Sequence, residues 1–233
     1  MEFSGQTAFV TGAGGGMGLQ ISNDLLRAGT NVIMVDVKPA PKGIARSKAK
    51  HLYVQANLST ETEVVRAVGA GINAFGAITL LANVAGVLLF GEDKSALDID
   101  LELWDQVMAI NLKSMVHTSR QIVPHMKAAG GGAMVHFSTI QALRGDDAPQ
   151  DAYQASKAGV IALSKSLAIQ LAPHKIRSNT ICPGPTASPM QARWEGDPDA
   201  IKSLSEAVPL GRPGRVEDMS NACLFLLSEK ASY

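Results

Sequence analysis

The feature that most constrains this chain is a glycine-rich stretch directly after its first hydrophobic run. The β-branched and apolar residues Thr7–Thr11 lead into Thr11-Gly12-Ala13-Gly14-Gly15-Gly16-Met17-Gly18, and an amphipathic pattern covers Leu19–Arg27. Glycine permits a sharp turn and a close approach of the main chain, and the helix that follows directs its free amides and partly positive end at the turn. A strand, a glycine turn and a helix in this order predict an anion-binding turn at the edge of an α/β sheet.

Short β-branched runs alternate with helical patterns along the rest of the chain, which is typical of parallel βαβ units. The clearest helical face covers Trp104–Lys127, and another helix is expected over about Ala152–Leu171, ending near Pro173. We therefore expect one α/β domain over residues 1–233, a Rossmann-like doubly wound parallel sheet with helices on both faces in three α/β/α layers. The expected strands are Thr7–Thr11, Val32–Asp36, Leu52–Gln55, Ile78–Ala82, Ala133–Ser138 and Ile176–Ile181.

Composition narrows the class of partner. The 21 basic and 21 acidic residues cancel, so net charge favours neither nucleic acid nor an anionic membrane as a partner. Two cysteines are too few for a disulfide scaffold or a four-cysteine zinc site, which predicts a reducing, cytoplasmic location. The longest apolar stretch is shorter than the roughly 20 residues that a spanning helix needs. The five histidines show no paired ligand spacing, so no metal site is expected.

Two features of the glycine turn bear on what it binds. Its spacing is Gly12-x3-Gly16-x-Gly18, whereas the strict dinucleotide spacing has glycine where Met17 stands, and no Gly-Lys-Ser/Thr follows as in a triphosphate-binding loop. Asp36 ends the second expected strand, where a carboxylate accepts hydrogen bonds from ribose hydroxyls and repels a 2′-phosphate. Lys38 stands close enough to accommodate a phosphate, but no basic residue lies within 13–15. The pattern therefore favours a dinucleotide, and NAD over NADP.

Four polar residues form the candidate catalytic set. Tyr153 and Lys157 are four apart on an expected helix, so both side chains lie on one face. A phenol is a poor base at neutral pH, but an adjacent ammonium group and an oxidised nicotinamide lower its pKa. Ser138 ends an expected strand, where a hydroxyl could hold a substrate oxygen, and Asn111 lies in the apolar stripe of the long helix, where a buried amide needs partners. Taken singly, each residue is explained more simply as a core, surface or strand-end position.

Together, these elements resemble the short-chain dehydrogenase/reductase superfamily, in its single-domain branch, over nearly the whole chain. The resemblance rests on the order of the elements, which is Thr11-Gly12-x3-Gly16-x-Gly18, Asn57-Leu58, Asn83-Val84-Ala85-Gly86, Asn111, Ser138, Tyr153-x3-Lys157 and Pro183-Gly184. It implies an oxidoreductase that interconverts a small secondary alcohol and a ketone or aldehyde by hydride transfer with NAD(P).

The resemblance also assigns roles to residues. Tyr153 would be the general acid/base, and Ser138 would orient the substrate oxygen. Lys157 would hold the nicotinamide ribose and lower the pKa of Tyr153, and Asn111 would hold a water of the proton relay. The implied cofactor-binding residues are Gly12, Gly14, Gly15, Gly16, Met17, Gly18, Asp36, Val37, Asn57, Leu58, Asn83, Ala85, Gly86, Tyr153, Lys157, Pro183, Gly184, Thr186 and Ser188.

Three departures from the family pattern stand out. Asn57 occupies a position that is usually Asp, and its amide oxygen can still accept a hydrogen bond from adenine. Thr186 and Ser188 compete for contact with the nicotinamide carboxamide, and Ser188 fits the usual position better. The interval from Ser138 to Tyr153 is long and includes Asp146-Asp147, so this loop is expected to carry substrate specificity, although a solvated loop is an equal alternative. A substrate loop is expected over about 184–213. Met190, Trp194 and Leu204 are candidates for an apolar lid, and the alternative is that Arg144 or Arg193 binds an acidic group of the substrate.

Other functions fit the residues less well. The alternative from a different class is a dinucleotide-sensing regulator or scaffold without turnover, but such proteins commonly lose a catalytic residue. An enoyl reductase typically has its Tyr and Lys farther apart, and a nicotinamide-retaining epimerase has a different glycine spacing and a larger substrate domain.

The family resemblance also implies a homotetramer or homodimer formed through long helices. Relatives continue past the position of Tyr233 into one more strand, so we expect the sequence to be a shortened version of a longer chain.

Overall fold

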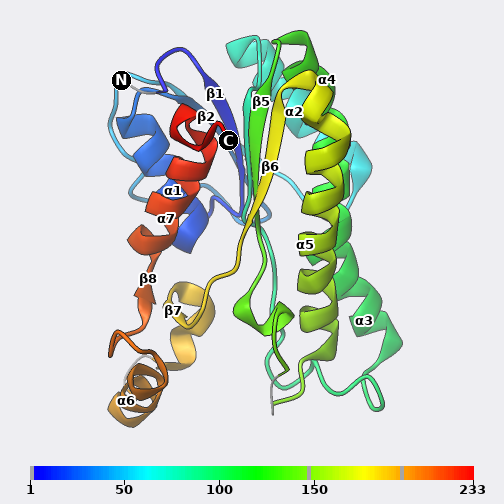
Figure 1. The fold of residues 1–233 in the computed structure, drawn as a ribbon, viewed down its shortest axis with the longest axis vertical. Helices are drawn as coiled ribbons and strands as arrows, with labels where there is room; N and C mark the ends of the chain where they lie inside the picture. The colour runs from blue at the N-terminus through cyan, green and yellow to red at the C-terminus, as the bar shows by residue number, and fades with distance from the viewer. Residues whose placement is uncertain (1–2, 146–147, 195–196) are drawn as a thin grey trace.

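Six parallel strands form the central sheet of the computed structural model, which describes residues 3–145, 148–194 and 197–233. The strand order is β3-β2-β1-β4-β5-β6, so the direction of winding reverses between β1 and β4 (Figure 1). This confirms the expected doubly wound fold, in which ligands bind beyond the carboxyl ends of the strands at the point of reversal. The strands are β1 Thr7–Thr11, β2 Asn31–Asp36, β3 His51–Gln55, β4 Leu80–Asn83, β5 Gly132–Phe137 and β6 Ile176–Ile181.

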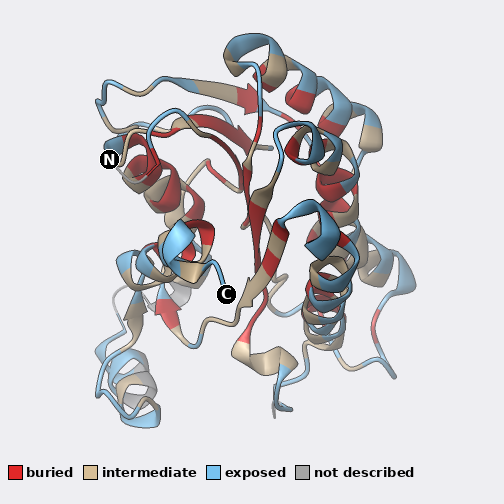
Figure 2. Ribbon diagram, turned by 45° about the horizontal axis from the view of Figure 1, so that its top comes forward, coloured by how far each residue is buried: buried red, intermediate tan, exposed pale blue. Residues whose placement is uncertain are grey.

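Helices cover both faces of the sheet (Figure 1). On one face lie α1 (Gly16–Arg27) and α7 (Val216–Leu227), and on the other lie α2 (Glu61–Phe75), α4 (Ser114–Ala128) and α5 (Asp151–Leu171), with α3 (Leu101–Met108) packed against α5. Alternate residues of a strand pack into the hydrophobic cores on the two sides of the sheet, because side chains on a strand point to opposite faces. Thus Ala8 and Val10 pack toward α1 and α7, whereas Phe9 packs toward α2 and α4. The buried residues of sheet and helices face one another in Figure 2.

The long helix expected over Trp104–Lys127 is interrupted in the structure. A π-helical turn, Ala109–Lys113, separates α3 from α4. The helix expected over Ala152–Leu171 is present as α5 and continues into a short turn, Ala172–His174, that contains Pro173. At the end of β5, Ser138 lies just past the strand rather than inside it.

The segment after β6 folds below the carboxyl edge of the sheet (Figure 1). Two short parallel strands, β7 (Thr186–Ala187) and β8 (Gly214–Arg215), enclose a helical turn at Pro189–Trp194 and helix α6 (Pro198–Ala207). This segment corresponds to the expected substrate loop. Further short turns lie at Ile140–Ala142 and Glu229–Ala231.

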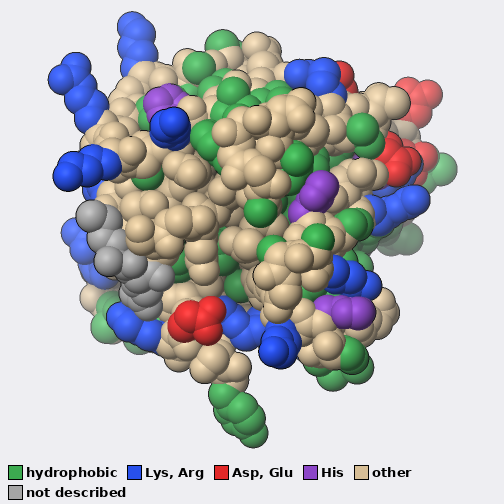
Figure 3. Space-filling model, turned by 90° about the horizontal axis from the view of Figure 1, so that it is seen from above, with side chains coloured by type: hydrophobic (Ala, Val, Ile, Leu, Met, Phe, Trp, Pro, Cys, Tyr) green, Lys and Arg blue, Asp and Glu red, His purple; other side chains and the backbone are tan. Residues whose placement is uncertain are grey.

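The opposite end of the molecule carries charges of both signs. Lys and Arg side chains stand around the rim of this face, with Asp and Glu between them (Figure 3). Among the described residues, no helix combines the length and the hydropathy that crossing a bilayer would require.

Candidate functional site

The glycine turn between β1 and α1 packs closely on itself and against the segment after β4. Gly12 has a left-handed φ of +69°, and a Cβ there would lie 2.9 Å from the main-chain nitrogen of Ala85, which follows β4. A Cβ at Gly18 would overlap the main-chain oxygen of Gly12, so α1 can begin inside the turn only if this position is glycine. Each glycine is therefore required by close main-chain packing, and the turn is held in one shape.

The amino end of α1 is open to a ligand. Gly15 precedes the helix, offers no side chain as a cap, and would have empty space around a Cβ. No acidic residue stands in the first turn of the helix. The free amides and the positive end of the helix dipole are therefore left for an external anion.

Asp36 borders the turn at the end of β2. Its carboxylate accepts hydrogen bonds from the main-chain nitrogens of Gly14, at 2.8 Å, and Lys38, at 2.9 Å. A Cβ at Gly14 would also lie 2.8 Å from this carboxyl group, so a side chain at position 14 would push Asp36 away from the turn. Burial and the Asp36 charge together raise the pKa of the neighbouring Tyr53 to about 12. The carboxylate is thus fixed beside the turn, where an adenosine ribose would extend from a diphosphate on α1.

Thr11 connects the two turns at the centre of the sheet. Its buried hydroxyl accepts hydrogen bonds from the main-chain nitrogens of Val84 and Ala85, at 2.9 and 3.0 Å. Asn83, at the end of β4, is also buried, and its amide bonds Thr118 and the Nδ1 atom of His136. The Asn83 side chain therefore supports the sheet, and only its main chain is left to face a cofactor. Sequence reasoning quoted Thr11 within the glycine motif but did not foresee this link.

Lys157 and Asn111 meet beside Gly86. A Cβ at Gly86 would lie 2.9 Å from Nζ of Lys157 and 3.2 Å from Oδ1 of Asn111. Asn111 is fully buried in the π-helical turn, where Oδ1 accepts from the main-chain nitrogen of Val87 and Nδ2 donates to its carbonyl and to Ser156. Both N–H donors of the buried amide and one acceptor site of Oδ1 are thus engaged by the protein itself. Asn111 therefore fixes the loop after β4 against α5.

Tyr153 and Lys157 lie on one face of α5, as their spacing predicts. Nζ of Lys157 lies 6.0 Å from the centre of the Tyr153 ring and donates to the main-chain oxygen of Phe137 at 2.9 Å. Among the described residues, no carboxylate forms an ion pair with it. Burial lowers the pKa of Lys157 to about 8. Burial raises the pKa of Tyr153, and a hydrogen bond with Thr139 opposes that rise.

Ser138 and Thr139 make different contacts at the end of β5. The buried hydroxyl of Ser138 donates to the main-chain oxygen of Lys157 at 2.7 Å, which holds β5 against α5. The next residue, Thr139, bonds the Tyr153 hydroxyl instead. The reason is geometric, because successive residues at the end of an extended strand project to opposite sides. Thr139 was not singled out from the sequence, because its contact with Tyr153 is seen only in the folded chain.

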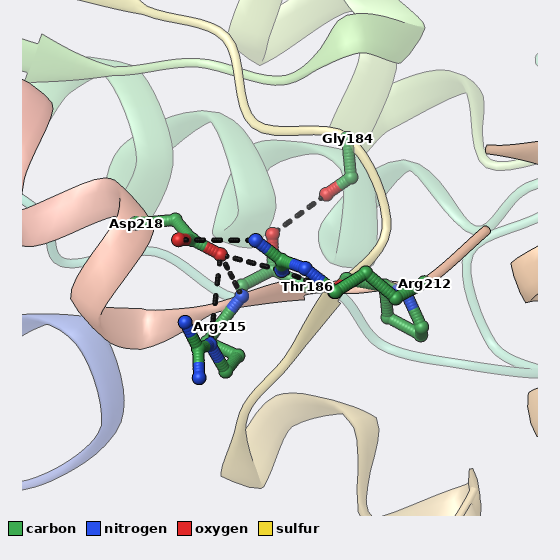
Figure 4. Close-up of polar contacts among 6 residues, drawn as sticks. Gly184, Thr186, Arg212, Arg215 and Asp218 are labelled. Atoms are coloured by element: carbon green, nitrogen blue, oxygen red, sulfur yellow. Dashed lines mark hydrogen bonds and ion pairs between the residues drawn. The ribbon is translucent and has the colours of Figure 1, made fainter. Parts of the chain in front are cut away.

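The segment after β6 is tied down at its two ends (Figure 4). At the first end, the Thr186 hydroxyl donates to the carbonyl of Gly184 at 2.9 Å. At the second end, Asp218 accepts from Arg212 at 2.8 Å and from the main-chain nitrogen of Arg215 at 2.8 Å. These bonds hold the pKa of Asp218 low, at about 2. The carboxylate thus anchors the returning chain to the first turn of α7.

The remaining predicted residues lie around this centre. Pro189 lies 3.3 Å from where a Cβ on Gly16 would be, and Ser188 lies 4.0 Å from it, so the substrate segment packs over the glycine turn.

The other predicted residues differ in exposure. Asn57 is exposed and its amide oxygen accepts from Ser59, whereas Leu58 is buried in the core. Met17 packs partly against the core and Val37 is exposed. Asp146 and Asp147 lie outside the described residues, as do the side chains of Trp194 and Leu204.

The donor set fits an elongated dinucleotide. An uncapped helix end suits a diphosphate, Asp36 suits the ribose at one side of it, and Lys157 suits the ribose at the other. Gly12, Gly14 and Gly18 leave no room for side chains along this path. Pro183 lies close to this centre, since its carbonyl accepts from the main-chain nitrogen of Ile140, the residue after Thr139, at 2.9 Å.

The whole chain is similar to known dehydrogenases and reductases. A family model described as enoyl-(acyl carrier protein) reductase matches residues 12–233. The cyclohexanol dehydrogenase of Acinetobacter sp. strain SE19 is 32% identical over 100% of this chain and 91% of that protein. The L-tagatose-forming galactitol 2-dehydrogenase of Cereibacter sphaeroides is also 32% identical, over 100% of this chain and 91% of that protein. The crystal structure of levodione reductase gives a TM-score of 0.89 at 28% identity, covering 99% of this chain and 93% of that one.

Proposed function

The chain belongs to the short-chain dehydrogenase/reductase superfamily, whose dehydrogenases act on CH–OH groups with NAD(P), and we propose that it oxidises a secondary alcohol reversibly with NAD as the preferred cofactor. The observation that carries the proposal is the buried ammonium group of Lys157 beside the Tyr153 ring, without a carboxylate partner among the described residues. A buried positive charge in this position serves a phenolate and a ribose rather than an ion pair.

We assign the proton transfer to Tyr153. In the oxidation direction its phenolate oxygen accepts the proton of the substrate hydroxyl, and in the reduction direction its hydroxyl returns a proton to the carbonyl oxygen. Burial disfavours the phenolate, whereas the Lys157 charge and the Thr139 hydrogen bond favour it. Bound NAD supplies the two-electron acceptor and a positive ring that favours the phenolate further. The balance of these effects sets the pKa of Tyr153, and therefore the pH at which its phenolate form can accept a proton.

We assign the orientation of the substrate oxygen to Thr139 rather than Ser138. Thr139 bonds the Tyr153 hydroxyl, so a third oxygen placed between them would contact both groups. Two fixed hydroxyls that meet at one reacting oxygen stabilise the charge that develops there. Ser138 supports the site from behind through the carbonyl of Lys157.

We assign Asn111 a role in positioning other residues of the site. Because its amide is engaged by Val87 and Ser156, we assign to it the placement of Gly86 close to Lys157. The role expected of Asn111 in holding a water of the proton relay stays a prediction. Of the two residues that compete for the nicotinamide carboxamide, we favour Ser188, whose side chain lies beside the glycine turn, 4.0 Å from where a Cβ on Gly16 would be.

The NAD preference rests on Asp36. A carboxylate fixed by two main-chain amides would accept ribose hydroxyls and repel a 2′-phosphate. A small alcohol is the substrate class that the relatives suggest, since one named relative acts on cyclohexanol and another on galactitol. The regulator alternative fits less well, because Tyr153, Lys157 and a hydroxyl at Thr139 are all present. We also propose a homodimer or homotetramer, which light scattering would test.

A substrate screen tests the proposed function. Purified protein is incubated with cyclohexanol, galactitol and other secondary alcohols, with NAD and NADP in parallel, and reduced cofactor is followed by absorbance. We expect turnover with at least one alcohol and faster reduction of NAD than of NADP. Absence of any turnover in either direction would favour the regulator, and faster reduction of NADP would contradict the role given to Asp36.

A further inference from the structure

The catalytic helix begins without a cap of its own. In α5 the first turn contains Ala152 and Tyr153, whose main-chain N–H groups have no partner within the helix. The preceding residue, Gln150, makes no side-chain cap hydrogen bond. Tyr153 therefore stands in a turn that would fray unless another part of the chain bonds these amides.

Asp93 supplies the missing partner from 60 positions away. It lies in the loop between β4 and α3 and is 3% exposed. Oδ1 accepts from the main-chain nitrogen of Ala152 at 3.1 Å, and Oδ2 accepts from that of Tyr153 at 2.8 Å. Among the described residues, no basic side chain forms an ion pair with this carboxylate. The amino end of α5 and its dipole therefore provide the compensation for this buried charge.

Asp151 makes a second contact between the same two segments. Its carboxylate accepts from the main-chain nitrogen of Ala96 at 2.7 Å, and its own N–H donates to the carbonyl of Lys94 at 3.2 Å. At the other end of the loop, Val87 is bonded to Asn111, which bonds Ser156 of α5. The loop over 87–96 is thus fixed to both turns of α5 that surround Tyr153.

We infer that Asp93 is a positioning residue for the catalytic tyrosine: its buried carboxylate, bonded to the Ala152 and Tyr153 amides, fixes the first turn of α5 and so the place of the phenol relative to the cofactor and the substrate loop. This inference rests on the proposed function. It differs from a general structural role because the bonded amide belongs to Tyr153 itself. Asp151 bonds the same loop but accepts from no amide of α5 among the bonds described above, and so offers a matched control.

The test compares Asp93→Asn and Asp93→Ala with Asp151→Asn. An asparagine side chain has one acceptor oxygen in place of two, so Asp93→Asn leaves one of the two helix amides without an acceptor. We expect kcat with cyclohexanol and NAD, or with the best alcohol found in the screen, to fall about tenfold or more in both Asp93 variants. The dissociation constant for NADH, measured by fluorescence, should change by about twofold at most, since the glycine turn and Asp36 are untouched. Asp151→Asn should keep kcat within about threefold of the unsubstituted protein.

A readout independent of activity is hydrogen exchange, followed by mass spectrometry on peptides that cover 150–157. Exchange there should accelerate about tenfold in Asp93→Asn at a temperature at which the whole protein stays folded. Faster exchange with an unchanged kcat would overturn the positioning role, as would unchanged exchange, or a loss of kcat equal to that of Asp151→Asn. If Asp93→Ala does not fold, Asp93→Asn alone decides the matter. Lack of turnover by the unsubstituted protein would overturn the proposed function as well, whereas full turnover by Asp93→Asn would overturn only this inference.

Discussion

Replacing Thr139 by valine removes one hydroxyl from the proposed active site and keeps the branched shape of the side chain. In the structure the Thr139 side chain bonds Tyr153, and its hydroxyl accepts from the main-chain nitrogen of Gln141 at 3.4 Å. Thr139 is also 6% exposed, so valine would fill the same space without adding an exposed apolar group. The substitution therefore separates the chemistry of the hydroxyl from packing.

The expected loss follows from what the hydroxyl does. A fixed donor to a reacting oxygen contributes roughly 100- to 1000-fold to kcat, or about 3–4 kcal/mol. Loss of the weaker bond to Gln141 at the start of a short turn would lower the free energy of unfolding by about 1 kcal/mol. The catalytic effect should therefore be well above anything that the small loss of stability explains.

Steady-state kinetics with a substrate from the screen measure this effect, and thermal unfolding measures stability. Ser138→Ala is the matched control, because it removes the neighbouring hydroxyl that bonds the carbonyl of Lys157. We expect Ser138→Ala to lower stability by about 1 kcal/mol and to keep most of kcat. If kcat fell strongly in Ser138→Ala and stayed near the unsubstituted value in Thr139→Val, the assignment to Thr139 would be wrong. The prediction made from the sequence, that Ser138 orients the substrate oxygen, would then hold.

Three further outcomes follow from the geometry. Asp36→Ala should lower the ratio of kcat/KM for NAD to that for NADP at least about tenfold, and an unchanged ratio would remove Asp36 from cofactor choice. Gly18→Ala should abolish NADH binding or folding, since its Cβ would overlap the carbonyl of Gly12, and a variant that binds NADH normally would contradict the packing of the turn. Burial lowers the pKa of His136 to about 4, so the chain takes up a proton on unfolding between about pH 6.5 and 4. As the pH is lowered through this range, the free energy of unfolding should fall by about 1.4 kcal/mol per pH unit because of this group, or about 3 kcal/mol in all. Denaturant titrations of His136→Asn should lack this part of the acid dependence, and an identical slope would show that other groups cause it.

Local patterns predicted most of the fold. Strands β1 and β6 have the bounds expected from their hydrophobic runs, and the glycine turn has the close contacts that its composition predicts. The π-helical turn at Asn111 could not be seen, because the apolar spacing on both sides of it is that of an ordinary helix. The buried amide at that position was the one sign of an irregularity.

Two site residues lay beyond what the sequence could decide. Ser138 and Thr139 are adjacent hydroxyl residues, and the choice between them depends on where β5 ends, which a pattern locates only to within a few residues. Asp93 acts on residues 60 positions later, and no periodicity relates a loop carboxylate to the helix that it caps. Both residues were identified by the hydrogen bonds that they make in the folded chain.

The central claim is that the phenol of Tyr153 transfers the proton, and Tyr153→Phe tests it directly because it removes only the hydroxyl. The measurement is kcat for NAD reduction in this variant, together with the NADH dissociation constant by fluorescence. We predict a fall in kcat of about 1000-fold or more, with the dissociation constant within about threefold of the unsubstituted protein. A variant that turns over at the unsubstituted rate would contradict the account.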